Sequence, residues 1–285
     1  MPLYQHKQHS QVRSDCVRCS PAGVPFRVPQ SFSRTVTPSP TPQHEACRST
    51  ASLAPVAARP MFIGIAGGRG AGKEHTCRNI IASVRQRGHS ELAERVLHLH
   101  LDDFHREMTA EEQQQLEAGR EEVNLDHPES FDFELLQKVL QQLAAGHSAV
   151  EVPVWDGRAR RRAAWRRVEG PAPRVVLVEG TLVLFVREVR ALLDMQVFLD
   201  VDSDTRLGRQ VRAALAAADG KSVDLKRWLD GYLFVAKPSF EEFVWPTKRW
   251  ADVIIPKGDS NDVAIGLIAQ RLIDLGHDDE HEHEP

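Results

Sequence analysis

A glycine-rich segment near residue 70 has the residue types and spacing of a phosphate-binding loop. The apolar run Phe62 to Ala66 is followed by GGRGAGK, in which Gly67, Gly72 and Lys73 fit the pattern GxxxxGK. Glycines let backbone N–H groups turn toward a phosphate, and the helix that follows adds its dipole. A glycine-rich surface turn is the alternative, but the strand–loop–helix setting favours nucleotide binding. The predicted nucleotide-binding residues are Gly67, Gly68, Arg69, Gly70, Ala71, Gly72, Lys73, Glu74 and His75.

The residue after the lysine departs from the usual pattern. Ser or Thr is expected there, because its hydroxyl holds Mg²⁺, but this chain has Glu74. A carboxylate can bind Mg²⁺, yet it is longer and its charge opposes the triphosphate. Thr76 lies two residues on, about 200° around the helix, and is a poor substitute. Glu74 is therefore predicted to impair this loop as a site for Mg²⁺ and the triphosphate.

Two acids stand at the ends of predicted strands. Asp102 follows Val96 to Leu101, and Glu179 closes the β-branched run that begins at Val175. Ligands of doubly wound sheets bind at the carboxyl ends of strands. Asp102 could accept a proton from an attacking hydroxyl, or could be a solvated strand-end acid. Glu179 needs a partner because an unpaired buried charge is costly, and Mg²⁺ or a nearby Arg or Lys could supply it.

Strands alternate with helices along the chain. The pattern predicts an α/β fold of the P-loop NTPase type, with a doubly wound parallel sheet, helices on both faces and a lid. Strands are expected at 62–66, 96–101, 175–179, 195–201 and 253–256. Helices are expected at 73–87, 111–120, 133–145, 204–218 and 261–275.

The chain divides into three parts by composition. Residues 1–59 are rich in Ser, Thr, Pro and Arg and are predicted to be a disordered extension, with an organellar transit peptide as the alternative. Residues 60–276 form the predicted kinase-like domain, and 277–285 an acidic, His-rich tail. Cys16 and Cys19 form a lone CxxC, which predicts unpaired thiols rather than a zinc site because no second half follows.

Charge and hydropathy exclude other classes of protein. The formal net charge of −4 gives no electrostatic reason to expect nucleic acid as a partner. No apolar run approaches the roughly 20 residues that span a bilayer, so no membrane association is expected. The glycine loop has GK spacing rather than GxGxxG with a later acid, which excludes a dinucleotide-binding oxidoreductase.

Seven segments in order resemble a known family. They are LDDFH (101–105), NLDHPESFD (124–132), VPVWD (152–156), VLVEG (176–180), DVDSDTRL (200–207), KPSFEEF (237–243) and ADVIIPKG (251–258). Together they resemble the uridine–cytidine kinase family in its eukaryotic form, within the phosphoribulokinase/uridine kinase P-loop superfamily. The likeness runs from about Phe62 to Leu275.

The resemblance implies a role for each matching residue. Asp102 would act on the nucleoside 5′-hydroxyl with Lys73 at the phosphates, and Glu179 would lie near Mg²⁺ together with Asp102. Asp126 would grip the ribose 2′- and 3′-hydroxyls; without the family match it could equally be a turn aspartate that caps a helix. The implied reaction uses ATP or GTP to make UMP or CMP in pyrimidine salvage. The resemblance further implies a homo-oligomer, a tetramer, and a cytoplasmic location, with plastid or mitochondrion as alternatives through the extension.

The predicted base pocket and lid depart from the family. Two aromatic positions differ, because Trp155 and His105 each stand where the family has a tyrosine. Arg160 stands in place of a histidine, and Gln210 stands in place of a lid arginine. Gly231 replaces a glutamine before Tyr232. Asp156 matches the family. The predicted substrate-binding residues are Asp126, His105, Trp155, Asp156, Arg160, Gln210 and Tyr232, and the lid cations are Arg209, Arg212 and Lys221.

Three hypotheses follow from these residues. An active nucleoside kinase is supported by Lys73, Asp102, Asp126 and Glu179. A kinase-fold binding or regulatory subunit with little catalysis is supported by Glu74 and the altered pocket. A P-loop kinase for another small hydroxylated substrate is supported by Arg160 within the basic run 158–167, because arginine forks suit phosphate and carboxylate. That run could instead be a solvated hairpin.

Overall fold

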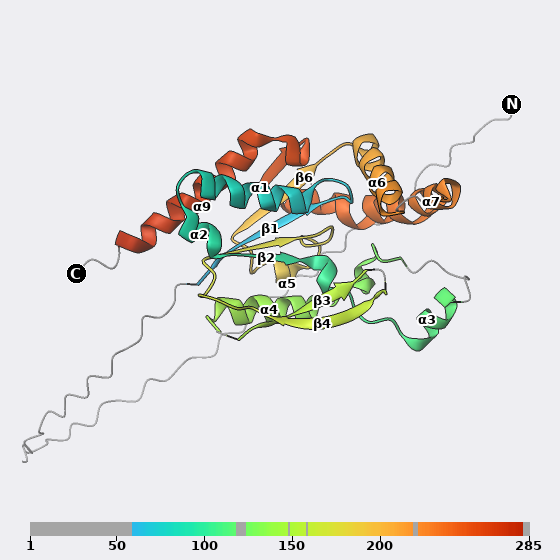
Figure 1. Ribbon diagram of the computed structural model, residues 1–285, viewed down its shortest axis with the longest axis horizontal. Helices are drawn as coiled ribbons and strands as arrows, with labels where there is room; N and C mark the ends of the chain where they lie inside the picture. Colours follow the sequence, from blue (N-terminus) through green and yellow to red (C-terminus); the bar gives the residue numbers. More distant parts are fainter. Residues whose placement is uncertain (1–58, 118–123, 148, 158, 219–221, 282–285) are drawn as a thin grey trace, which may run out of the picture. The chain divides into compact units, whose positions relative to one another are not determined.

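A five-stranded parallel sheet organises the part of the chain that the structure describes, which is residues 59–117, 124–147, 149–157, 159–218 and 222–281 of a computed structural model (Figure 1). The strand order is β2-β5-β1-β6-β7. The strands are β1 (Met61–Gly67), β2 (Val96–His100), β5 (Val175–Glu179), β6 (Met195–Asp200) and β7 (Val253–Pro256). The prediction of a parallel α/β sheet is confirmed.

The sheet is buried on both faces, as its continuous apolar strands predict. Alternate residues of each strand point to opposite sides. Ile63 and Leu177 belong to one buried cluster, whereas Phe62 and Val176 belong to another. All five residues of β5 are buried, which places the carboxylate of Glu179 at the edge of the core.

Helices cover the two faces of the sheet (Figure 1). Helices α1 (Lys73–Gln86), α2 (Ser90–Glu94) and α9 (Asp262–His281) pack on the face that carries Ile63. Helices α4 (Phe133–Ala144) and α5 (Arg187–Arg190) pack on the face that carries Phe62. The layers therefore leave the carboxyl ends of the strands for the loops that carry the predicted site.

Two smaller elements extend the second face. Strands β3 (Glu151–Asp156) and β4 (Arg161–Arg167) pair as an antiparallel hairpin, and β4 is largely exposed. The interpretation of the basic run as a solvated hairpin is supported for Arg161, Arg166 and Arg167, which are exposed, whereas Arg160 and Arg162 are partly buried. The short helix α3 (Ala110–Glu117) carries the polar, helix-forming sequence that predicted it.

The segment after β6 forms an irregular helical arm. Helix α6 (Ser203–Ala217) begins at Asp202, whose side chain accepts a hydrogen bond from Thr205 N, and α7 (Leu225–Gly231) follows. From Tyr232 the chain passes through π-helical, α-helical and 3₁₀ turns, namely η3 (Tyr232–Ala236), α8 (Lys237–Ser239), η4 (Phe240–Val244) and η5 (Trp245–Trp250). The sequence predicted α6 but not this continuous arm.

Helix α9 differs from the prediction at its carboxyl end. The helix was expected to end at Leu275, but it continues to His281, so the predicted tail begins inside a helix. The N-terminal extension, Cys16 and Cys19, and the predicted lid residue Lys221 lie outside the described residues. Among the helices of the described segments, none is long and apolar enough to cross a membrane.

Candidate functional site

The phosphate loop joins β1 to α1 and needs its glycines. Gly70 and Gly72 have φ values of 78° and 88°, in the left-handed region that favours glycine. A Cβ on Gly70 would lie 2.6 Å from the backbone oxygen of Arg206, and one on Gly72 would lie 2.6 Å from Cγ of Asp259. Gly72 N-caps α1, and Nζ of Lys73 lies 3.4 Å from the carbonyl oxygen of Gly68, folded back over the loop.

Side chains of helix α6 hydrogen-bond the backbone of the phosphate loop. Arg209 donates a hydrogen bond from Nη1 to Gly70 O at 3.2 Å and pairs with Asp259 at 2.9 Å. Gln210 donates from Nε2 to Arg69 O at 3.1 Å. The predicted lid residue Arg209 and the predicted substrate-binding residue Gln210 therefore contact the loop, whereas Arg212 bonds the carbonyl of Gly208 in its own helix.

The adjacent acids after β2 have different environments. They lie in the 3₁₀ turn η1 (Leu101–Phe104). Asp103 Oδ1 accepts a hydrogen bond from Trp155 N at 3.1 Å, which ties β3 to this turn. Asp102 is exposed, and its carboxylate has no hydrogen-bond or ion-pair partner among the described residues. Asp102 is thus the acid that remains available to a ligand.

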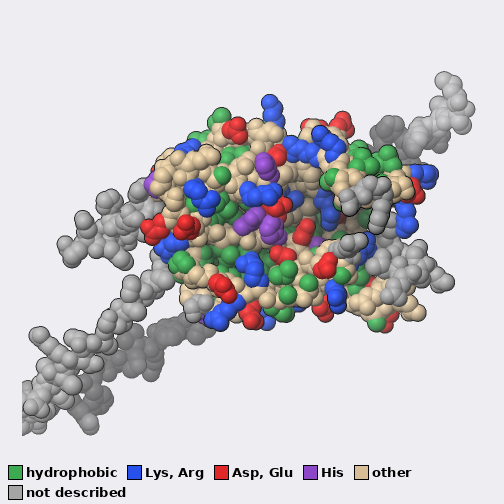
Figure 2. Space-filling model, viewed as in Figure 1, with side chains coloured by type: hydrophobic (Ala, Val, Ile, Leu, Met, Phe, Trp, Pro, Cys, Tyr) green, Lys and Arg blue, Asp and Glu red, His purple; other side chains and the backbone are tan. Residues whose placement is uncertain are grey.

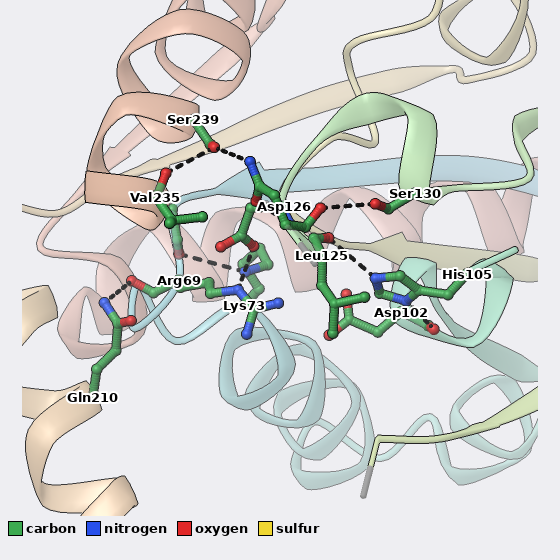
Figure 3. A network of polar contacts seen from close by, with 12 residues as sticks. Arg69, Lys73, Asp102, His105, Leu125, Asp126, Ser130, Gln210, Val235 and Ser239 are labelled. Carbon is green, nitrogen blue, oxygen red and sulfur yellow. Dashed lines mark hydrogen bonds and ion pairs between the residues drawn. The ribbon is translucent and has the colours of Figure 1, made fainter. Parts of the chain in front are cut away.

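Asp126 is connected to the phosphate loop by an ion pair with Arg69 (Figure 3). Only 14% of the Asp126 side chain is exposed. Burial lowers the pKa of Arg69, but the charges of Asp126 and Asp102 outweigh it and the pKa of Arg69 is raised. Arg69 therefore lies between the two acids that the sequence assigned to the substrate.

A hydrogen-bond network fixes the loop that carries Asp126 (Figure 3). Asn124 Oδ1 accepts from Asp126 N at 3.0 Å, and Asn124 Nδ2 donates to Ser239 Oγ at 2.8 Å. Ser130 Oγ donates to Asn124 O at 2.8 Å. Sequence reasoning did not select Asn124 or Ser239, although both lie inside the family-like segments.

His105 links the Asp102 turn to the Asp126 loop. The side chain is buried, and its Nδ1 and Nε2 lie 2.7 Å from Asp102 O and 3.2 Å from Leu125 O. Its ring stacks on Trp155 with centroids 5.1 Å apart. His105 therefore connects the backbone next to Asp102 with the backbone next to Asp126 and fixes the distance between the two loops.

A cavity of about 480 Å³ lies beside Asp126 and brings together residues from distant segments. Arg160 lines it in a left-handed conformation with φ of 50°, and its Nη1 is buried with no hydrogen-bond partner among the described residues. Tyr232 is buried and stacks on Trp228, with centroids 6.2 Å apart. Arg69, Asp126, Gln210 and Tyr232 also line an adjoining cavity of about 500 Å³.

Two predicted pocket residues serve the β3–β4 hairpin. Asp156 Oδ1 accepts a hydrogen bond from Ala159 N at 2.9 Å and so anchors the turn. Trp155 is half-buried between this turn and His105. Neither residue lines the cavity that contains Arg160, among its described lining.

Glu179 has a histidine partner. Its Oε1 lies 2.8 Å from Nδ1 of His100, which is its direct neighbour across the β2–β5 pairing. This hydrogen bond raises the pKa of His100. Sequence reasoning expected a metal, an Arg or a Lys as the partner of Glu179, and it did not single out His100.

Two carboxylates that suit Mg²⁺ lie at the edge of the sheet where the phosphate loop follows β1. Asp102 and Glu179 lie at the carboxyl ends of the neighbouring strands β2 and β5. Hard oxygen donors of this kind fit Mg²⁺, which prefers carboxylates, waters and phosphate oxygens. Residues that could hold the ion are therefore present even without a Walker Ser or Thr.

Glu74 does not turn toward the phosphate loop. Its side chain is 55% exposed, and Oε1 lies 3.5 Å from Nη1 of Arg78, one helical turn on. Thr76 is fully buried, so its hydroxyl does not replace the missing one. His75 is exposed beside Glu74.

These features define a P-loop kinase fold: a strand, glycine loop and helix in sequence, acids at the ends of neighbouring strands, and a helical arm that contacts the loop. The chain belongs to the phosphoribulokinase/uridine kinase family, which residues 62–264 match.

Two relatives named as uridine–cytidine kinases agree with this assignment. The chain is 39% identical to uridine-cytidine kinase 2-B of Danio rerio over 217 residues, which is 76% of this chain and 80% of that protein. It is 36% identical to a chloroplastic uridine/cytidine kinase of Arabidopsis thaliana over 75% of this chain, but it spans only 41% of that relative. A solved structure of a possible uridine kinase from Bacillus stearothermophilus matches 70% of this chain and 89% of its own, with 21% identity and a TM-score of 0.46.

Proposed function

We propose that this protein transfers the γ-phosphoryl group of ATP to the 5′-hydroxyl of uridine or cytidine. The observation that carries the proposal is the ion pair between Arg69 of the donor loop and Asp126 of the acceptor loop, with Lys73 and Asp102 close by (Figure 3). The names and identities of the relatives support the same substrate class.

Each residue has a role that its environment permits. Lys73 contacts the β- and γ-phosphates, and the backbone N–H groups of Gly70 to Lys73 surround them. Asp102, exposed and unpaired among the described side chains, orients the hydroxyl and accepts its proton during in-line attack. Asp126 accepts hydrogen bonds from the ribose diol, and Arg209 next to Gly70 neutralises the transferring group.

Mg²⁺ supplies charge neutralisation between the phosphates when it is bound. Asp102 and Glu179 would hold it, and Glu179 would exchange the His100 hydrogen bond for the ion or for one of its waters. The donor can be ATP or GTP.

A second acceptor class is favoured by one observation. Nη1 of Arg160 is buried without a partner and lines the cavity next to Asp126. A buried guanidinium donor without a partner is costly, and a phosphate or carboxylate on the acceptor would satisfy it. The alternative acceptor is therefore a small hydroxylated compound that carries an anionic group.

A coupled ATPase screen of the purified full chain tests the proposal. The acceptors are the ribonucleosides, their 5′-monophosphates and small sugar phosphates, each at saturating Mg²⁺. Turnover on uridine or cytidine is the expected result, and turnover only on anionic acceptors favours the second class. Nucleotide binding with no turnover on any acceptor would contradict both and favour a binding or regulatory subunit.

Assembly and compartment are part of the same proposal. We expect a homotetramer, which light scattering of the purified chain measures. We expect cytoplasmic residence, with a plastid or mitochondrion as the alternative if residues 1–59 act as a transit peptide, and a fluorescent fusion with and without that segment distinguishes them.

A further inference from the structure

Three metal-ligating side chains lie together beside the phosphate loop. They are His98, His100 and Glu179, whose ligand atoms all lie within 4.8 Å of one another. In the space-filling view, histidine side chains are visible close to α1 and β2 (Figure 2). The kinase mechanism uses only Glu179 from this group, so the two histidines have no role in it.

The scaffold makes this grouping rigid. His98 and His100 are two residues apart on β2, so their side chains leave the same face of the sheet, and their ring centroids are 4.2 Å apart. His100 is the direct neighbour of Glu179 in the parallel β2–β5 pairing. Two of the ligands are on the edge strand β2 and one is on the neighbouring strand β5, and strands position ligands more firmly than loops do.

One of the donor atoms lacks a partner among the described residues, and the other two already face each other. His98 Nε2 is buried and has no hydrogen-bond partner among the described residues. His100 Nδ1 already faces Glu179 Oε1 at 2.8 Å. Donors bound to one Zn²⁺ at about 2.0–2.2 Å lie roughly 3–3.6 Å apart, so small side-chain rotations bring all three into range.

We infer that His98, His100 and Glu179 form a binding site for a divalent transition-metal ion of the Zn²⁺ class. Two imidazoles and one carboxylate are the ligand set of open Zn²⁺ sites, in which water or substrate takes the fourth position. The side chain of His100 is 37% exposed, which gives the ion access from solvent. Such a set binds Zn²⁺ far more strongly than Mg²⁺, which disfavours nitrogen ligands.

Glu179 belongs to the Zn²⁺ site and also to the proposed Mg²⁺ site of the kinase. A Zn²⁺ ion that engages Glu179 removes this carboxylate from Mg²⁺, so Zn²⁺ and Mg²⁺·ATP are antagonists. The metal site itself does not depend on the proposed function, and binding can be measured without turnover.

The test is a Zn²⁺ titration of the full chain against a chromogenic chelator, with Co²⁺ absorption to report coordination. The background carries Cys16→Ser, Cys19→Ser and Cys47→Ser. Gln replaces the terminal histidines His6, His9, His44, His277, His281 and His283, so that the termini offer no Cys or His ligand. The expected result is one ion per chain in this background, with the visible bands of four-coordinate Co²⁺.

Variants locate the ion. His98→Leu with His100→Ser should weaken Zn²⁺ binding by at least 100-fold and abolish the Co²⁺ bands, and each single change should weaken it by at least tenfold. His147→Gln, at an exposed turn, is the matched control and should bind as the background does. Circular dichroism shows whether each variant is folded. If the double variant does not fold, His100→Gln is tested in its place.

Two outcomes overturn the inference. The first is Zn²⁺ binding of equal strength in the background and in a folded His98→Leu/His100→Ser or His100→Gln variant. The second is no stoichiometric binding in the background. If the chain is active, loss of Zn²⁺ inhibition in the double variant agrees with antagonism between Zn²⁺ and Mg²⁺·ATP. Zn²⁺ inhibition that persists in the double variant contradicts this antagonism.

Discussion

Arg69 of the phosphate loop and Asp126 of the acceptor loop, 57 residues apart in the chain, form an ion pair across the mouth of the site. This pair connects the segment that binds the donor with the segment proposed to bind the ribose. A diol that hydrogen-bonds Asp126 must share or displace the guanidinium of Arg69. The pair therefore predicts that Arg69 opposes ribonucleoside binding when no nucleotide is present.

The first prediction concerns Arg69→Gln. Partly exposed ion pairs contribute about 0.2–1 kcal/mol. In the variant a nucleoside binds Asp126 without breaking this ion pair, so the Kd for uridine or cytidine should fall by up to about fivefold. Isothermal titration calorimetry without nucleotide measures this, with 2′-deoxyuridine as the comparison ligand. A weaker affinity in the variant would mean that Arg69 instead holds Asp126 in its binding position.

The second prediction concerns the sugar. Asp126 should favour ribonucleosides over 2′-deoxyribonucleosides, because loss of one hydroxyl leaves a largely buried carboxylate partly unpaired, at about 1–3 kcal/mol. The expected ratio of kcat/KM is roughly 5- to 150-fold. Asp126→Asn should bring the ratio close to one, and a ratio unchanged by this substitution would remove Asp126 from sugar recognition.

The third prediction separates the adjacent acids after β2. Asp102→Asn should lower kcat by at least about 100-fold with little change in nucleoside affinity, because a general base contributes ~10²–10⁴ in rate. Asp103→Asn is the matched control, since an amide oxygen can still accept the hydrogen bond from Trp155 N. Equal losses in the two variants would show that the turn matters rather than the base.

The fourth prediction concerns Lys73. Lys73→Ala should abolish measurable Mg²⁺·ATP binding or turnover, because Nζ is the cation folded over the phosphate loop at 3.4 Å from Gly68 O. Binding of a fluorescent ATP analogue measures the loss. Lys138→Ala, on the exposed side of α4, controls for general effects of removing a lysine. Equal nucleotide affinity in the Lys73 variant and the wild type would contradict the assignment of the loop.

The elements that carry the site could be predicted from local sequence. Val175 to Glu179 is a continuous apolar run that ends in an acid, and only a strand buried on both faces explains it. The glycine cluster after Phe62 to Ala66 fixes the loop between strand and helix. Because the carboxyl ends of parallel strands lie at one edge of a sheet, Asp102 and Glu179 were both expected at the ligand-binding edge, whereas the position of β5 between β2 and the phosphate-loop strand β1 was not expected.

Contacts between distant segments could not be predicted in the same way. Nothing near Arg69 indicates that its partner is Asp126, because the pair depends on how two loops meet. The arm after Tyr232 lacks a clear 3.6-residue pattern, and Pro238 has no N–H to donate to a preceding turn. His98 and His100 did carry a signal, since histidines two apart on a strand share a face, but the sequence does not show which residue of the neighbouring strand lies beside them.

The last prediction concerns Glu74, whose carboxylate pairs with Arg78 at 3.5 Å instead of turning into the phosphate loop. A triphosphate bound at Lys73 brings several negative charges near this side chain. Two unit charges about 4 Å apart interact by about 4 kcal/mol at an effective dielectric of about 20. The exposure of Glu74 and the charge of Arg78 reduce this repulsion, so only part of it is expected in practice.

Glu74→Ser and Glu74→Thr should therefore strengthen Mg²⁺·ATP binding, raise kcat, or both, since each also supplies the hydroxyl that Mg²⁺ uses in related loops. Arg78→Ala is the complementary variant, and it should weaken ATP binding because it leaves the Glu74 charge without its partner. Calorimetry and steady-state kinetics at saturating Mg²⁺ separate metal affinity from chemistry. A wild type that binds more tightly and turns over faster than both Glu74 variants would identify Glu74 as a working Mg²⁺ ligand, reached by rotation away from Arg78.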